Sequence, residues 1–205
     1  WHANALQSAL APAARVLKEG SQCFTILPEP AAGFVASAVE AGCASNLALD
    51  GFAYLDENHP LQLTWVTRSA SREVKKVNLQ RIVREAAHTC LMELGEPCHY
   101  LKLYTAVFAA LAENHAFPTT VQQLTYETVS SIHAEIVKVF ADRKLLRRLE
   151  TTAQDPESGL WWLTQPEGCQ IALADRVEIE LVNWLQKEKS LPAANVISRM
   201  NERFT

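Results

Sequence analysis

The stretch Leu79–Leu94, LQRIVREAAHTCLMEL, carries the clearest repeat of apolar residues in the chain. Its leucine, isoleucine, valine, alanine and cysteine residues recur every three or four positions, which is the spacing of one face of an α-helix. Gly95 is placed to end this helix, and Pro97 prevents it from resuming. The stretch therefore predicts an amphipathic helix that opens a domain.

Two more helices and a hairpin are predicted after this helix. Residues 100–116 and 126–142 carry apolar residues at helical spacing, and a Pro-Thr-Thr segment breaks the chain between them. Residues 145–151 and 160–164 have the composition of strands, and a loop rich in turn-forming residues joins them. Three helices followed by a β-hairpin predict a mainly α winged-helix domain, a form of helix-turn-helix, over residues 79–166.

The third predicted helix would be the recognition helix if this domain binds DNA. Serine and threonine on its outer face could contact phosphates or bases, whereas acidic residues there oppose DNA. The outer face is expected to carry Glu127, Thr128, Ser131, Glu135, Lys138 and Asp142. DNA contact and a purely packing or protein-docking role therefore both stay open for this helix.

The first third of the chain has the element order of an α/β sheet. Helical spacing at residues 2–18 is followed by an apolar strand at 22–27 and a second helix. Residues 47–55 and 61–67 then have the composition of two strands joined by a turn. The first strand is apolar on both faces, as in a buried strand of a larger sheet. We expect residues 1–68 to be the C-terminal part of a Rossmann-like α/β domain.

Residues 167–205 complete the chain as a predicted helical hairpin, because two stretches of helical spacing are separated by a proline. The hairpin is expected to pack on the predicted wing or on residues outside this chain. Trp161, Trp162 and Trp184 are expected in the core rather than as base-stacking groups. A surface position of the Trp161–Trp162 pair would instead favour a docking role.

The formal net charge of −4 does not by itself indicate nucleic-acid binding. Basic residues are nevertheless clustered in residues 68–84, around a predicted basic linker at 69–78, and again just after the third helix. A locally basic face can bind phosphate on an acidic protein, and a solvated charged surface is the other interpretation. The candidate nucleic-acid-binding residues are Arg68, Arg72, Lys75, Lys76, Lys138, Arg143, Lys144, Arg147 and Arg148.

Four segments carry a resemblance to a known family: APAARVLKEGSQCFTILPEP in the α/β part, then GEPCHYLKLYTAVFAALAE, GLWWL and LADRVEIELVNWL. The first resembles the last part of a class I S-adenosylmethionine-dependent methyltransferase, and the other three resemble the region after the catalytic domain in large prokaryotic DNA methyltransferases of the adenine or N4-cytosine type. The resemblance implies a restriction-modification protein with an upstream catalytic domain, S-adenosylmethionine as its cofactor and duplex DNA as its partner. The chain starts at Trp1 and stops at Thr205 within a predicted helix, so we expect a piece of such a protein.

A complete catalytic site is not expected in this chain. The family needs a glycine-rich turn for the cofactor and an Asp/Asn-Pro-Pro-aromatic segment for a flipped base. The sequence contains no Gly-x-Gly and no Pro-Pro, so no catalytic, cofactor-binding or metal-binding residue is assigned. The single Glu85-x-x-His88 spacing is expected to be structural, because carboxylate-bridged metal sites need two copies.

The cysteine pattern and the length of the apolar runs indicate the cellular compartment. Five cysteines without a Cys-x-x-Cys pair favour reduced thiols in a cytoplasmic protein over disulfides or zinc. No apolar run approaches the roughly 18 residues of a membrane span. We expect a non-catalytic portion of a DNA methyltransferase that binds or orients DNA. The alternative is a protein–protein interaction module without nucleic-acid contact.

Overall fold

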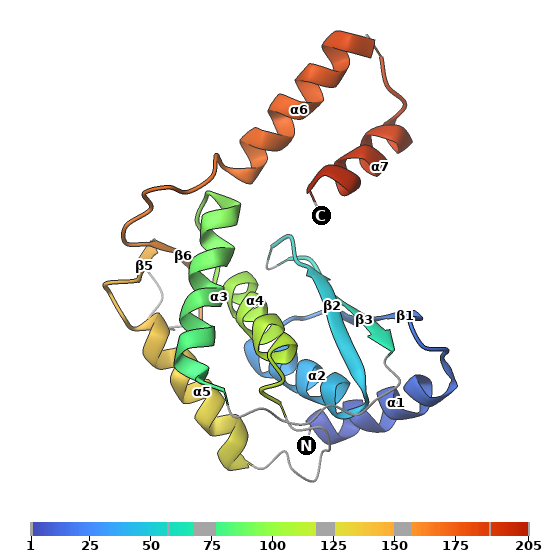
Figure 1. The fold of residues 1–205 in the computed structure, drawn as a ribbon, viewed down its shortest axis with the longest axis vertical. Coiled ribbons are helices and arrows are strands. Elements are labelled where there is room, and N and C mark those ends of the chain that lie inside the picture. Colours follow the sequence, from blue (N-terminus) through green and yellow to red (C-terminus); the bar gives the residue numbers. More distant parts are fainter. Residues whose placement is uncertain are drawn as a thin grey trace.

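The computed structural model describes residues 2–56, 58–67, 77–117, 126–149, 157–188 and 190–204, with no side-chain detail at 126–129. Within these residues the chain forms seven helices and two three-stranded antiparallel sheets, so the fold is mixed with helices dominant. Figure 1 shows the two sheets on either side of a central group of helices, with a helical hairpin extending away from them.

The first half of the chain builds one sheet and its helices. The elements are α1 (His2–Val16), β1 (Gln22–Leu27), α2 (Ala32–Ala44), β2 (Leu47–Ala53) and β3 (Leu61–Thr67). The strand order is β1-β3-β2, and β3 is antiparallel to both neighbours. Strands β1 and β2 therefore run parallel to each other and are joined by α2, which is a β-α-β unit with a strand inserted in its middle.

The two faces of this sheet differ sharply in exposure. On the face toward α2, Leu61, Leu63 and Trp65 of β3 are fully buried. On the opposite face, Phe24 and Ile26 of the edge strand β1 are 57% and 61% exposed. Large apolar side chains are usually covered by other elements, whereas those on the outer face of β1 are exposed to solvent.

The second half of the chain builds the second sheet and three helices. The elements are α3 (Leu79–Leu94), β4 (Cys98–His99), α4 (Tyr100–Glu113), α5 (Tyr126–Phe140), β5 (Leu146–Leu149) and β6 (Leu160–Leu163). The three predicted helices and both predicted strands are confirmed, with α4 and α5 ending a few residues early. Strand β4 was not predicted, and it pairs with β6 to give the order β4-β6-β5.

Helix α3 has the ends that its sequence indicates. The Asn78 side chain caps the start by accepting a hydrogen bond from the backbone N–H of Arg81 at 3.0 Å. Gly95 ends the helix in the left-handed region at φ 69°, where glycine is favoured. A Cβ at Gly95 would lie 2.2 Å from the carbonyl oxygen of Gln170, so only glycine lets the later segment pass this close.

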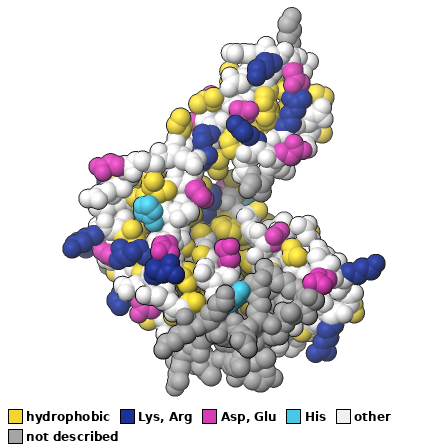
Figure 2. Space-filling view, in the orientation of Figure 1, with side chains coloured by type: hydrophobic (Ala, Val, Ile, Leu, Met, Phe, Trp, Pro, Cys, Tyr) yellow, Lys and Arg dark blue, Asp and Glu magenta, His cyan; other side chains and the backbone are white. Residues whose placement is uncertain are grey.

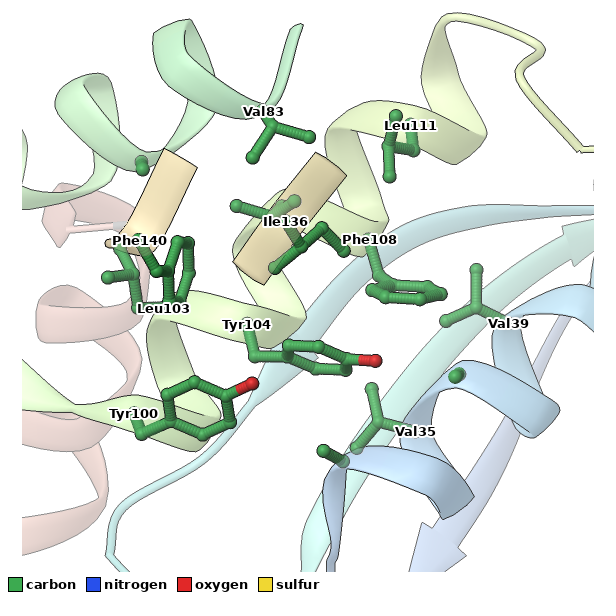
Figure 3. Close-up of a cluster of buried hydrophobic side chains, with 14 of the residues drawn as sticks. Val35, Val39, Val83, Tyr100, Leu103, Tyr104, Phe108, Leu111, Ile136 and Phe140 are labelled. Atoms are coloured by element: carbon green, nitrogen blue, oxygen red, sulfur yellow. The ribbon is translucent and has the colours of Figure 1, made fainter. Parts of the chain in front are cut away.

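Helix α4 occupies the centre of the core. Figure 3 shows Tyr104 and Phe108 of α4 lying toward Val35 and Val39 of α2, with α3 and α5 on the other side of α4. The Tyr104 and Phe108 ring centroids are 4.7 Å apart. The buried residues form one continuous cluster that includes side chains from both sheets. The two halves of the chain therefore share one hydrophobic core.

One carboxylate is buried beside this core. Glu40 on α2 is only 3% exposed, and its Oε1 has no hydrogen-bond partner. Removal from water penalises the charged form, so burial raises the pKa of Glu40 to about 7. Burial also raises the pKa of the Tyr104 phenol, with a smaller contribution from the charge of Glu40.

The chain ends in the predicted helical hairpin, α6 (Leu173–Glu188) and α7 (Ala193–Phe204). The guanidinium of Arg199 lies 5.7 Å from the centroid of the Trp184 ring and also pairs with Glu188, which links the two helices. Neither helix buries a residue fully, and three apolar side chains on α6 are exposed: Ile179, Val182 and Leu185. The hairpin thus contributes little to the core.

Replacing Gly42 by alanine is expected to destabilise the fold. A Cβ there would lie 2.5 Å from two atoms of the Trp65 ring, which is fully buried and hydrogen-bonded to Thr25. Overpacking of this kind costs about 1–3 kcal/mol, measurable by urea unfolding. Gly33→Ala in the same helix meets no atom within 4 Å and is the matched control. Equal stability of the two variants would contradict this account of the packing.

Replacing Glu40 by glutamine is expected to stabilise the fold above pH 7. Because the folded pKa is raised, the folded chain binds more protons than the unfolded chain between about pH 4.5 and 7. Wild-type stability should therefore fall as the pH rises through this window. Glu40→Gln should remove most of that fall, and its free energy of unfolding at pH 8 should exceed that of the wild type by up to about 3 kcal/mol. The exposed Glu19→Gln is the control, and parallel pH profiles would refute the assignment.

Candidate nucleic-acid interface

The predicted basic residues fall into two groups. Arg68, Arg72, Lys75 and Lys76 lie outside the described residues, so their positions stay a prediction. The other five lie at the end of α5, in the turn after it and on β5. This second group can be built up from its backbone.

A tight turn held by Asp142 connects α5 to β5. The Asp142 carboxylate accepts a hydrogen bond from the backbone N–H of Lys144 at 3.0 Å. The backbone carbonyl oxygen of Asp142 accepts hydrogen bonds from the backbone N–H groups of Leu145 and Leu146 at 2.9 and 3.0 Å. This bonding replaces the helical pattern, which is why α5 ends before residue 142. The turn leaves the side chains of Arg143 and Lys144 exposed.

Arg84 fixes this turn to α3. Its Nη2 lies 2.5 Å from Oδ2 of Asp142, across 58 residues of sequence. The hydrogen bond from Arg84, together with the Lys144 backbone bond, lowers the pKa of Asp142 below its ordinary value. Arg84 belongs to the basic stretch noted in the sequence, but nothing in its spacing indicated that it pairs with an acid after the third helix.

Neighbouring arginines on β5 have different environments. Arg147 is exposed, whereas Arg148 is half-buried and its Nη2 donates a hydrogen bond to Oγ of Ser158 at 2.8 Å. Arg148 lies opposite Trp161 in the strand register, and Trp161 packs against Tyr100 and Phe140. Because successive side chains of a strand alternate between faces, Arg147 is available for a ligand and Arg148 is mostly part of the structure.

The exposed face of α5 differs from the expected one. Glu135 is half-buried, pairs with Lys138 at 3.6 Å, and has an Oε2 atom that is buried without a hydrogen-bond partner. Asp142 is neutralised by Arg84. Both of these acids expected on the outer face are thus half-buried and paired with a basic side chain. The side chains of Glu127 and Thr128 lie outside the described residues, while Ser131 and Lys138 are exposed as expected.

Positive charge predominates around this turn. We call Lys138, Arg143, Lys144 and Arg147 the basic surface. Among the described residues, only Lys138 of this set forms an ion pair with a carboxylate, and Lys144 also interacts electrostatically with Asp142, while the side chains of Arg143, Lys144 and Arg147 are exposed. Figure 2 shows Lys and Arg side chains gathered on this flank of the body, on the left of the view. Such a cluster suits phosphate or another polyanion.

An open pocket of about 300 Å³ adjoins the basic surface and is lined by Arg84, Glu85, His88, Thr89 and Leu145. The Glu85-x-x-His88 pair forms part of its wall. Across the described ranges no cluster of three or more His, Cys, Asp or Glu residues could hold a metal ion. All five cysteines carry free thiols.

Three glycines of the first half lie within regular elements of the structure. Gly33 and Gly42 lie within α2 and Gly51 lies within β2. A nucleotide-like cofactor needs glycine in a turn after a strand, where the backbone can approach it closely.

Comparisons with known proteins place no constraint on this interface. No family model, no curated protein and no solved structure matches the chain. Within the part of the chain that the structure describes, none of the helices combines the length and apolar character that crossing a bilayer requires.

Replacing Arg84 by glutamine is expected to raise the pKa of Asp142 toward its ordinary value, because the largest cause of the lowering is lost. Carboxyl carbon chemical shifts followed by NMR through acidic pH would measure this. Arg81→Gln is the matched control, since Arg81 pairs with Glu85 within α3 instead. An unchanged Asp142 titration in Arg84→Gln would disprove the coupling of α3 to the turn.

Proposed function

We propose that this chain is the non-catalytic C-terminal portion of a DNA methyltransferase, and that residues 79–166 form a winged helix that binds or orients duplex DNA. The observation that carries the proposal is the basic surface, which lies where the third helix of this unit meets its hairpin. Cationic side chains beside a helix that has an open face are the electrostatic footprint expected of a DNA-binding domain.

The topology of the second half supports the winged-helix interpretation. A winged helix packs a hairpin against three helices, and here β5 and β6 follow α3, α4 and α5 in that order. Strand β4, between α3 and α4, completes the sheet by pairing with β6. The buried side chains of α4 and α5 point toward one core, so the hairpin and helices form a single unit.

The topology of the first half supports the link to a larger catalytic domain. Its β1-α2-β2 crossover joins two parallel strands, as crossovers in Rossmann-like sheets do, with the difference that the antiparallel strand β3 lies between them. Strand β1 stands at the edge with Phe24 and Ile26 exposed, as expected if further strands and helices of the same domain complete it. In this proposal S-adenosylmethionine and the catalytic residues belong to that upstream domain.

Within the proposal, Arg143, Lys144 and Arg147 contact phosphates. Their side chains are exposed and form no ion pair with a described carboxylate, so binding a phosphate there would release counterions. Phosphate contacts carry no sequence information by themselves. These residues would therefore supply affinity and orientation, and would hold the target duplex beside the catalytic domain.

The proposal predicts salt-dependent binding that is weakened by Arg143→Glu combined with Arg147→Glu. The two lost contacts should lower the affinity for a 20-base-pair duplex at least about tenfold and flatten the log–log salt slope by about two. Fluorescence anisotropy over a salt series measures both quantities.

The matched control reverses two charges elsewhere. Arg15→Glu with Lys18→Glu changes the net charge by the same amount, on and just after α1, away from the basic surface. These two residues are exposed, so the fold should tolerate the change. Undetectable or salt-independent binding of the wild type at low ionic strength would overturn the DNA role.

A protein-docking module is the second candidate. The exposed Ile179, Val182 and Leu185 on α6 favour it, because apolar side chains gathered on one helix suit a partner surface. The Trp161–Trp162 pair does not favour it, since both rings are buried. Partner association that survives the arginine reversals, in the absence of any duplex binding, would support this alternative.

A further inference from the structure

From the exposed face of α5 we infer that Ser131, Ala134 and Val137 read thymine in the major groove, with Ala134 and Val137 packing on the C5 methyl groups. The inference rests on the proposed function, because it assumes that the basic surface brings duplex DNA to α5. It goes further by assigning base selection to three residues that no charge pattern indicates.

The three residues form a continuous stripe. Each is three positions from the next, so consecutive members are neighbours on the helix surface in a row that winds across about 120° of it, and all three are exposed. Val137 is 47% exposed, whereas its neighbours Ile136 and Val139 are buried in the core. The stripe spans about 9 Å of helix axis at 1.5 Å per residue. At 3.4 Å per base pair, this length covers nearly three base pairs.

The charges around the stripe decide what covers it. Lys138 lies beside Val137 and is largely exposed, and Arg143, Lys144 and Arg147 follow in the turn and on β5. A row of small and apolar side chains with exposed cations at one end is complementary to a groove that has phosphates along its edges. The stripe itself carries no charge, and Glu135, the acid beside it among the described side chains of α5, is half-buried and paired with Lys138. Duplex DNA is therefore the occupant that we assign.

The chemistry of the stripe selects the base. Alanine and valine side chains neither donate nor accept hydrogen bonds, so they cannot distinguish bases by polar atoms. In the major groove the one apolar group that marks a natural base is the C5 methyl of thymine. The Ser131 hydroxyl can donate to or accept from an adjacent base edge or phosphate. The stripe is thus matched to thymine-containing steps.

The experiment changes only the methyl groups of the DNA. Wild-type affinity is measured by fluorescence anisotropy for a mixed-sequence 20-base-pair duplex rich in A·T pairs, and for the same duplex with deoxyuridine replacing thymidine. Burying one methyl group is worth a factor of about four, so the uracil duplex should bind about four- to tenfold more weakly. The salt slope should be unchanged, because the phosphates are the same.

A second pair of duplexes tests the methyl group independently. A G·C-rich duplex is compared with the same sequence carrying 5-methylcytosine, which restores a methyl at the equivalent groove position. The wild type should bind the methylated duplex more tightly. Equal affinity within each duplex pair would overturn the inference.

Variants connect this discrimination to the stripe. Val137→Ala should lower the affinity for the thymine duplex and reduce the thymine-to-uracil ratio, while its stability stays near that of the wild type because the side chain is exposed. Ile197→Ala on α7 is the matched truncation of an exposed branched side chain, and it should keep the wild-type ratio. If Val137→Ala kept the wild-type ratio of affinities for the thymine and uracil duplexes, Val137 would not be a thymine contact.

The inference and the proposed function fail in different ways. Salt-dependent binding with no methyl preference would remove the thymine reader and leave phosphate-based DNA binding in place. Undetectable binding to every duplex at low salt would remove both.

Discussion

The packing of α4 is the constraint on which the rest of the structure depends. Tyr104 and Phe108 fill the space beneath α2, while other faces of the same helix contact α3 and the second sheet. Both sheets are too small to be stable alone, since three strands need a packed layer on one face. One helix buried on several sides supplies that layer to each of them, so the two halves of the chain fold around a shared core.

The same packing determines which surface is left for a ligand. Ile132, Ile136 and Val139 fix one side of α5 in the core, so its opposite side faces solvent. The Arg84–Asp142 pair then holds the turn after α5 against α3. The basic surface and the apolar stripe of α5 are thus displayed by rigid elements, which suits recognition because little conformational entropy is lost on binding.

The sequence predicted what depends on long repeats. Helix α3 and its end at Gly95 are predicted correctly, because sixteen residues with apolar side chains at helical spacing are incompatible with a strand or a loop. Strand β4 could not be predicted, since its two residues show no periodicity. The orientation of Glu135 and the pairing of Arg84 depend on tertiary contacts across the fold. The sequence composition identified the candidate basic residues. Only the structure shows that Arg147 on β5 is exposed while Arg148, on the other face of the strand, is half-buried and bonded to Ser158.

That alternation makes the length of a loop part of the recognition chemistry. Leu146 points into the core and Arg147 out of it, and the Asp142 turn sets this phase. Removing one residue between Phe140 and Leu146 would rotate the strand by one step. Arg147 would then point toward the core, and Leu146 and Arg148 would point away from it. The number of residues in this loop therefore fixes which side chains of β5 face solvent, independently of which residues occupy positions 143 and 144.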